Sequence, residues 1–231
     1  MTHPCLQSNM RNVVKKILLV LLLLVGVGIL LYPKISDYVN RIHSSSAMQS
    51  VSQKVHNTSR EDLERQLALA RGYNEALLQK KPFAAEYEDI LNFEDGIMGI
   101  VRIPAIGVEL PIYHGIGSDV LSKGAGHMPQ TAFPIGGVGN HSVLTGHTGL
   151  PSAELFTDLS KLRIDDIFYV SVAGKELAYR VDQILTVLPT DNSALAAVAG
   201  MDYCTLVTCT PYGINSHRLL VRGHRVEEGK P

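Results

Sequence analysis

The sequence predicts a mainly β fold, a closed barrel or a sandwich, preceded by N-terminal helices and by one transmembrane helix. From Gly96 onward, short segments of β-branched, aromatic and aliphatic residues are separated by turns that contain Gly and Pro, as in all-β domains. Between residues 58 and 77, apolar residues recur at spacings of three and four, the period of an amphipathic helix. Upstream of both, residues 17–32 form an apolar run without a charge.

The apolar run is predicted to be a retained membrane anchor that ends at Pro33. At about 1.5 Å per residue, its length is slightly less than the roughly 30 Å of a hydrocarbon core. Tilt, bilayer thinning and snorkelling by Lys15 and Lys16 can close the difference. A cleaved signal peptide is the alternative, but its small-x-small site should follow the run promptly, whereas Ser45-Ser46-Ala47 lies far downstream.

The basic residues before the run set the expected orientation. The positive-inside tendency assigns residues 1–16 to the cytoplasm, residues 17–33 to the membrane and the remainder to the outside of the cell. No second apolar span follows, so a single-pass protein of the cell membrane is expected. The net charge of −1, without a basic block after the anchor, argues against a nucleic-acid partner.

The segment between anchor and barrel divides into two parts. Residues 34–57 are polar and serine-rich, which suits a stalk or an exposed continuation of the membrane helix. Residues 58–95 are predicted to hold an N-terminal helix and a lid region. Thr58-Ser59-Arg60-Glu61 resembles a capping box, and the amphipathic helix after it should pack on the domain rather than on a partner. Further on, Phe83 is an aromatic residue without periodic partners and could plug a groove.

Residues 96–226 are predicted to form the barrel and residues 227–231 a tail. The segments with strand character are Gly99 to Ile103, Val108 to Tyr113, Ser142 to Thr145, Ile167 to Ser171, Glu176 to Val187, Tyr203 to Thr208 and Arg218 to Gly223. Brief helical connections are expected at Ser152 to Leu162 and Asn192 to Ala199.

Cys204 and Cys209 are the cysteines downstream of the anchor. On one strand, five residues at roughly 3.3 Å place their Cα atoms about 16 Å apart, and the odd spacing points the side chains to opposite faces. They should therefore not form a disulfide with each other. Cys204 is predicted to be a core residue. Cys209 lies where the strand ends, and an unpaired thiol there indicates chemistry.

Cys209, His147 and Arg218 form a plausible nucleophilic set. A second strand begins around Arg218, so the intervening turn could return the guanidinium close to the sulfur, and His147 lies where a third strand ends. By strand alternation, His217 should point away from the side of Arg218.

Non-catalytic roles for these residues also remain open from the sequence alone. His147 could be an ordinary turn histidine, because other histidines are available at positions 114, 127, 141, 217 and 224, and Arg218 could be a surface charge. A zinc site from these histidines and two cysteines is disfavoured because the CxxC and HxxxH spacings are missing. No run of close carboxylates suggests calcium, although ligands could come from separate loops. No metal ligand is assigned, and no cofactor is expected.

Three separated motifs resemble those of a known family. Thr205-Leu206-Val207-Thr208-Cys209 resembles the signature of sortases, the membrane-anchored transpeptidases of Gram-positive surfaces, and Thr145-Gly146-His147 and Arg218 occur in the matching order. The longer strings Leu110 to Gly115, Leu144 to Pro151 and Cys209 to Arg222 are most similar to the class C, pilin-polymerising branch. The resemblance extends over roughly Tyr73 to Arg225.

The resemblance implies an eight-stranded β-barrel in which the three residues meet at one groove. Cys209 would attack the threonine carbonyl of an LPxTG-like sorting signal in a pilin, form a thioester and release the C-terminal tail; a lysine amine of the next pilin would resolve the thioester. His147 would protonate the leaving amine and later deprotonate the attacking one. Arg218 would stabilise the oxyanion or align the substrate backbone. Thr208 of the signature is a further candidate for substrate contact.

Two departures from the class C pattern matter. Those enzymes usually have a lid with an Asp-Pro-aromatic motif, and Lys81-Pro82-Phe83 occupies the corresponding region here. Pro82 and Phe83 are therefore lid candidates, while Lys81 cannot make the contacts of the acid, so a weaker or differently tethered lid is expected. The C-terminal hydrophobic segment of many of these enzymes is also missing, which indicates either a single anchor or a truncated sequence.

Two alternatives to pilin polymerisation remain. A housekeeping sortase would join surface proteins to cell-wall peptide, and a non-catalytic scaffold for pilus assembly would keep the groove without turnover. The lid region and the string from Cys209 to Arg222 favour the pilin polymerase, and the intact set of Cys209, His147 and Arg218 argues against the scaffold.

Overall fold

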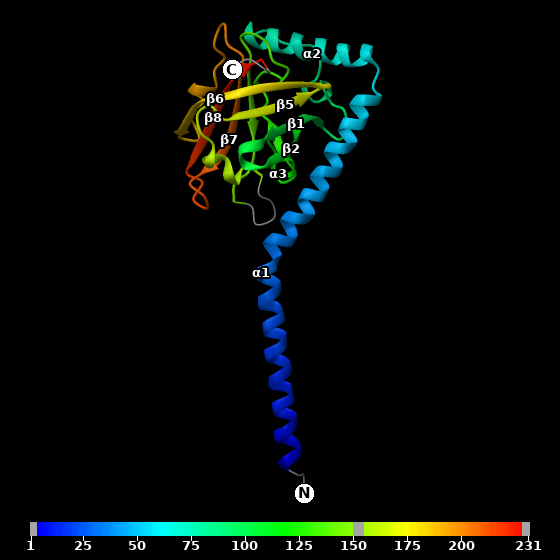
Figure 1. The fold of residues 1–231 in the computed structure, drawn as a ribbon, viewed down its shortest axis with the longest axis vertical. Coiled ribbons are helices and arrows are strands. Elements are labelled where there is room, and N and C mark those ends of the chain that lie inside the picture. The colour runs from blue at the N-terminus through cyan, green and yellow to red at the C-terminus, as the bar shows by residue number, and fades with distance from the viewer. Residues whose placement is uncertain (1–3, 150–154, 228–231) are drawn as a thin grey trace.

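A computed structural model describes residues 4–149 and 155–227, with the backbone alone for residues 4–13. It contains a closed eight-stranded barrel with the strand order β1-β2-β3-β4-β7-β8-β6-β5, carried at one end of a long N-terminal helix (Figure 1). The mainly β barrel with N-terminal helices is thus confirmed. Most of the predicted tail, the end of the motif from Leu144 to Pro151 and the start of the segment from Ser152 to Leu162 lie outside the described residues.

Seven of the strands coincide with predicted segments to within a few residues. The bounds are β1 Ile97–Ile103, β2 Val108–His114, β3 Ala125–His127, β4 His141–Thr145, β5 Ile167–Val172, β6 Lys175–Val187, β7 Tyr203–Thr210 and β8 His217–Val226. The sequence reading missed β3, which has three residues and contains Gly126. A Cβ at that position would collide with the carbonyl oxygen of Gly115, so close packing excludes the β-branched residues that usually mark a strand.

Short helices precede the barrel or connect its strands. These are η1 Tyr87–Asp89, η2 Pro104–Ile106, α3 Ser118–Leu121, η3 Thr157–Lys161 and η4 Ser193–Leu195, with η3 and η4 inside the two predicted helical connections.

Strand alternation divides the buried residues into two clusters. The barrel interior takes side chains such as Leu144, Leu206 and Val221. On the opposite face of the same strands, Val143, Val207 and Leu220 form a smaller buried cluster, which is covered by side chains that include Leu195 from the β6–β7 connection. Val207 and Leu220 of this second cluster also line the site described below.

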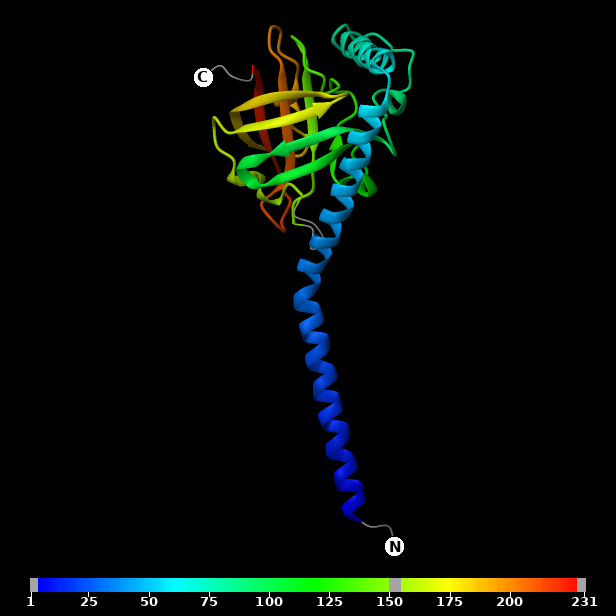
Figure 2. The same cartoon turned by 45° about the vertical axis from the view of Figure 1, so that its right-hand side comes forward.

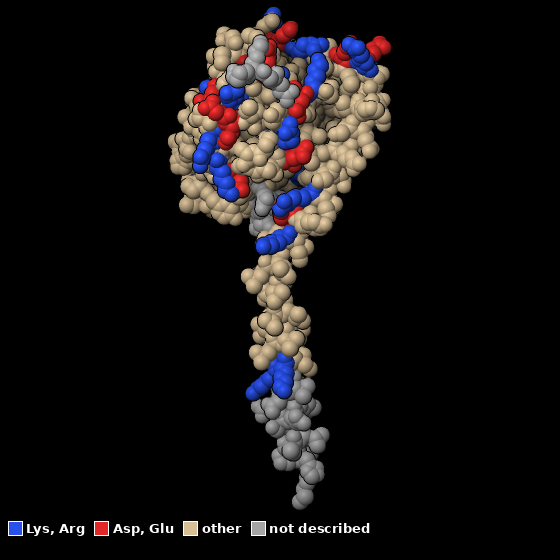
Figure 3. Space-filling model, viewed as in Figure 1, with Lys and Arg blue, Asp and Glu red and all other residues tan. Residues whose placement is uncertain are grey.

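The anchor and stalk predicted from the sequence belong to one helix, α1 Pro4–Asn57, which continues through Pro33. An 18-residue window near the N-terminus has a mean hydropathy of 2.6 and is wholly exposed, so α1 is a candidate membrane span. On the face drawn in Figure 3, a stretch of α1 without Lys, Arg, Asp or Glu lies between basic side chains and the barrel.

The upper part of α1 packs on the barrel. Val51 is buried, Ser44 Oγ donates a hydrogen bond to the Lys123 carbonyl (3.3 Å), and Ser50 Oγ donates to the Glu94 carboxylate. Of the two alternatives for residues 34–57, the helical continuation is therefore the one observed, and it is fixed to β1 and β2 rather than free of the domain.

The second helix, α2 Arg60–Leu78, packs on the domain as predicted, but its cap lies one residue further along. Ser59 is the N-cap, and its side chain accepts a hydrogen bond from the Asp62 N–H (3.0 Å). Thr58 instead ends α1, because its hydroxyl donates to the Lys54 carbonyl (2.7 Å). Buried Asn74 fastens α2 to the barrel by accepting from the Phe133 N–H (2.7 Å) and donating to the Phe133 carbonyl (3.2 Å).

The two ends of the barrel differ in what covers them. Figures 1 and 2 both show α2 at the end away from the turn between β7 and β8, while that turn lies toward the N-terminal half of α1.

Candidate active site

The three predicted catalytic residues line one pocket of about 360 Å³. His147 follows β4, Cys209 lies near the end of β7 and Arg218 near the start of β8. All three are partly exposed, so a ligand can reach them.

The hairpin of β7 and β8 places Cys209 beside Arg218. Their Cα atoms are direct partners in the antiparallel ladder, and Thr210 and His217 form the next pair. Directly opposed side chains share one face of a sheet, with Cβ atoms about 5 Å apart. His217 therefore lies on the other face, as expected from alternation. The prediction that the turn returns the guanidinium to the sulfur matches this register.

Parallel pairing of β4 with β7 brings in His147. The ladder aligns Thr145 with Val207, and extending it by two residues sets His147 alongside Cys209. The backbone there is held by the Gly146 N–H, which donates to the Val207 carbonyl (3.0 Å), and by the His147 carbonyl, which accepts from the Phe156 N–H (3.0 Å). A Cβ on Gly146 would lie 2.6 Å from the Phe156 ring, so this close turn requires glycine.

Arg218 is oriented by its own turn. Its Nη1 donates to the carbonyls of Asn215 (3.3 Å) and His217 (3.1 Å). The guanidinium carries five donors, so this anchoring leaves several for a ligand in the pocket. A fixed cation thus lies across the ladder from the thiol.

Cys204 has a different environment from Cys209. It is fully buried, and desolvation raises the pKa of its thiol far above the usual range, with a smaller contribution from Asp202. Both cysteines are free. The prediction of a core role for Cys204 is confirmed.

The structure places Thr208, the substrate candidate, in a buried position, and the lid candidates Pro82 and Phe83 away from the pocket. Thr208 borders the pocket, but it is buried and its hydroxyl donates to the Gly146 carbonyl (2.7 Å), so it supports the turn that carries His147. Phe83 packs against α2, with its ring 6.0 Å from that of Tyr73, and Pro82 is exposed. Neither is among the described residues that line the pocket, so in this structure Phe83 does not cover Cys209. The tertiary contact with Tyr73 determines its position.

Sequence reasoning missed part of the pocket wall. Thr145, Asp191 and Asn192 also line it. Asp191 is exposed, and its pKa is lowered, chiefly by the Ser193 hydroxyl (2.6 Å) and also by the Ser193 N–H (3.0 Å), so it keeps a negative charge at the rim. Strand alternation offered a signal for Thr145, which lies two residues before His147 on the same face, whereas the loop residues carried none.

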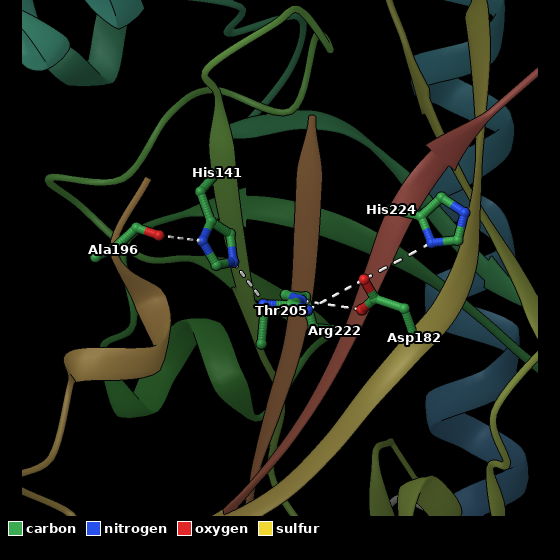
Figure 4. A network of polar contacts seen from close by, with 6 residues as sticks. All are labelled: His141, Asp182, Ala196, Thr205, Arg222 and His224. Atoms are coloured by element: carbon green, nitrogen blue, oxygen red, sulfur yellow. Dashed lines mark hydrogen bonds and ion pairs between the residues drawn. The ribbon is translucent and has the colours of Figure 1, made fainter. Parts of the chain in front are cut away.

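A polar network secures the β6–β7 connection beside the pocket (Figure 4). His141 Nδ1 lies 3.0 Å from the Ala196 carbonyl and Nε2 lies 2.7 Å from Thr205 Oγ1. A carbonyl can only accept, so Nδ1 carries the proton and neutral His141 accepts from Thr205. Burial, the largest influence, lowers the pKa of His141 and favours this neutral form. Ala196 follows Leu195, which lines the pocket, so the network holds one wall in place.

Charged residues extend the same network across the barrel surface. Arg222 binds Asp182 through two hydrogen bonds (2.9 and 3.1 Å) and stacks over the Tyr203 ring at 4.1 Å.

Within the part of the chain that the structure describes, no group of three or more His, Cys, Asp or Glu could hold a metal ion.

Comparison with known proteins agrees with this geometry. Residues 101–226 match the model of the sortase domain. The chain is similar to sortase A of Streptococcus agalactiae serotype III (strain NEM316), with 26% identity over 207 residues, which cover 86% of this chain and 79% of that protein.

Solved structures of class C sortases are more similar. A pilus-related sortase C of Group B Streptococcus has 43% identity and a TM-score of 0.72 over 78% of this chain and 97% of that one. A Clostridium perfringens sortase C, solved with the C-terminal cell wall sorting motif, has 40% identity and a TM-score of 0.74 over 79% and 99% of the two chains. A cysteine, a histidine and an arginine in one pocket on such a barrel, together with these matches, show that the chain belongs to the sortase family of cysteine transpeptidases.

Proposed function

We propose that this protein polymerises pilins. In this proposal it cleaves an LPxTG-like sorting signal after the threonine and joins the threonine carbonyl to a lysine amine of the next pilin. The observation that carries it is the convergence of Cys209, His147 and Arg218 on one pocket of a barrel similar to class C pilus sortases.

The first half-reaction is acyl transfer to sulfur. The Cys209 thiolate attacks the threonine carbonyl carbon, and the carbon–nitrogen bond breaks after the tetrahedral intermediate. His147 gives its proton to the leaving amine, which departs with the C-terminal tail. Arg218, opposite Cys209 in the ladder, donates to the oxyanion through a planar, permanently charged fork.

The second half-reaction reverses these roles. The lysine amine attacks the thioester carbon, His147 takes the proton from that amine, and the Cys209 thiolate leaves. The net result is an isopeptide bond and a regenerated enzyme. Splitting the exchange into two acyl transfers lowers each barrier, and no cofactor is needed for either.

The membrane arrangement belongs to the same proposal. The apolar segment of α1 would cross the membrane once, with the barrel outside the cell where pilins are displayed. Its wholly exposed apolar surface supports a lipid environment for that segment.

The test uses cells whose only copy of this protein carries the substitution. With Cys209→Ala, the high-mass covalent pilin ladder should collapse to monomer, whereas the matched variant Cys204→Ala should keep the ladder, because Cys204 lies in the core. A ladder that persists but is shed into the medium would indicate wall anchoring instead. An unchanged, wall-bound ladder would support the scaffold.

A further inference from the structure

Thr145 has an unsatisfied hydroxyl in the pocket. Its Oγ1 is buried and lacks a hydrogen-bond partner, and it is alone in this among the buried side-chain nitrogen and oxygen atoms of the described residues. Buried polar groups in folded proteins are nearly always paired, and leaving one unpaired is destabilising. An exception that lines an active site therefore indicates a partner that arrives with a ligand.

The residues around Thr145 provide no hydrogen-bond partner for its hydroxyl. On β4 it pairs with Val207 of β7 and Gly126 of β3, and the apolar side chains of Val207 and Leu220 line the pocket beside it. The nearby Thr208 hydroxyl is already donated to the Gly146 carbonyl. Thr145 thus borders the pocket beside apolar residues and carries a buried hydroxyl oxygen that lacks a partner.

The position of Thr145 fixes where that partner would lie. Thr145 is two residues before His147, a separation of about 6.6 Å along an extended strand. A peptide lying extended along β4 has the same rise per residue, so the partner lies about two peptide residues from the reacting carbonyl. Counting back two residues from the threonine of an LPxTG-like signal leads to proline, which has no N–H, so the group available there is a carbonyl.

We propose that the Thr145 hydroxyl donates a hydrogen bond to a backbone carbonyl of the bound sorting peptide, about two residues before the scissile bond. This inference rests on the proposed function and names one residue that aligns its substrate. Thr145 is a positioning residue: it does not touch the reacting atoms, and it holds the peptide so that the threonine carbonyl faces Cys209.

The experiment compares Thr145→Val, Thr145→Ser and the control Thr186→Val in the full-length protein in detergent. Thr186 is exposed on β6 and is not among the described residues that line the pocket. Three quantities are measured: steady-state cleavage of an LPxTG peptide, alkylation of Cys209 by iodoacetamide followed by mass spectrometry, and the urea midpoint of unfolding.

Thr145→Val should separate binding from stability. KM should rise about 3- to 10-fold with kcat nearly unchanged, the effect of one neutral hydrogen bond made equally in ground and transition states. The urea midpoint should stay equal or increase, because an unpaired hydroxyl is replaced by a methyl group. Thr145→Ser should restore KM to within about twofold, and all variants should alkylate Cys209 at the wild-type rate.

Two results would overturn the inference. An unchanged KM in Thr145→Val would show that the peptide does not use the hydroxyl. A lower urea midpoint together with slower alkylation would show a structural role. If the wild-type protein itself does not cleave the peptide, the proposed function fails instead, which the wild-type measurement reports separately.

Discussion

Arg218 faces Cys209 across the β7–β8 ladder, where it supplies both charge and directed donors. Arg218→Ala should lower kcat for peptide cleavage by about 10²- to 10³-fold, the usual effect of losing one oxyanion donor. Arg218→Lys should recover only part of this, because an ammonium keeps the charge without the planar fork. Full activity in Arg218→Lys would show that the charge alone suffices. The exposed Arg163→Ala serves as the control.

Gly146 is the point where the turn before His147 tolerates no side chain. Gly146→Ala would place a methyl group 2.6 Å from the Phe156 ring, and we expect a loss of about 1–3 kcal/mol in the free energy of unfolding, with reduced activity. Urea unfolding of Gly146→Ala, Phe156→Leu and the double variant forms a mutant cycle. A favourable coupling energy in the double variant is expected because the smaller side chain relieves the clash. Strict additivity would contradict this explanation.

The start of α2 depends on Ser59 rather than Thr58. Ser59→Ala removes the hydrogen bond to the Asp62 N–H and should destabilise the first turn of α2 by about 1 kcal/mol. Thr58→Ala should have a smaller effect there, because its hydroxyl serves the end of α1. Hydrogen exchange of the first α2 amides measures both. A larger effect from Thr58 would restore the cap position expected from the sequence.

The β6–β7 connection is held to the barrel by His141. His141→Phe keeps an aromatic ring against Tyr203 but removes the contacts to Ala196 and Thr205. We expect faster hydrogen exchange in residues 188–200 and a higher KM for the sorting peptide, since Leu195, Asn192 and Asp191 line the pocket. His224→Phe, which changes a more exposed histidine of the same surface, is the control. Unchanged exchange in His141→Phe would exclude an anchoring role.

Some elements were readable from the sequence and others were not. β7 and β8 follow from runs of apolar and β-branched residues, and the set of Cys209, His147 and Arg218 follows from motif order. Two adjacent residues able to cap a helix made the cap position ambiguous. The observed position of Phe83 was not predictable, because its contact with Tyr73 is tertiary and has no local period. Strand alternation could have placed Thr145 beside His147, but a hydroxyl is recognised as unpaired only when all of its neighbours are known.

At the scale of the whole molecule, buried histidine makes stability depend on pH. His127 is fully buried: its Nε2 donates to the Ala132 carbonyl (2.9 Å) and its Nδ1 accepts from the Tyr87 hydroxyl (2.8 Å). Desolvation, the largest cause, lowers the pKa of His127 from 6.5 to about 4. The unfolded chain therefore binds the proton first as pH falls, and the stabilisation present above pH 6.5 is lost progressively down to pH 4.

The resulting loss in the free energy of unfolding is on the order of 3 kcal/mol for His127. His141 acts in the same direction, while burial raises the pKa of Asp202 and offsets part of the loss at the acid end. Urea unfolding of the full-length protein in detergent at pH values from about 7.5 to about 4.5 measures the slope of the free energy of unfolding against pH. His127→Gln should make this slope shallower. An equally steep slope in that variant would show that other groups cause the loss of stability at acid pH.

The unbroken α1 helix has a consequence for where a sorting signal can react. The end of the barrel that carries the site lies toward the N-terminal half of α1. With the apolar segment in the bilayer, this continuous helix sets both the height of the site above the membrane and the direction in which the site faces around the helix axis. Each residue inserted just after Pro33 would add about 1.5 Å of height and about 100° of rotation. Seven residues would raise the site by about 10 Å while nearly preserving its direction, whereas two would mainly turn it away. The height of the site and its direction can thus be varied separately by the length of the insertion. In the present arrangement the site lies toward the membrane segment, which suits a sorting signal that is held close to the bilayer.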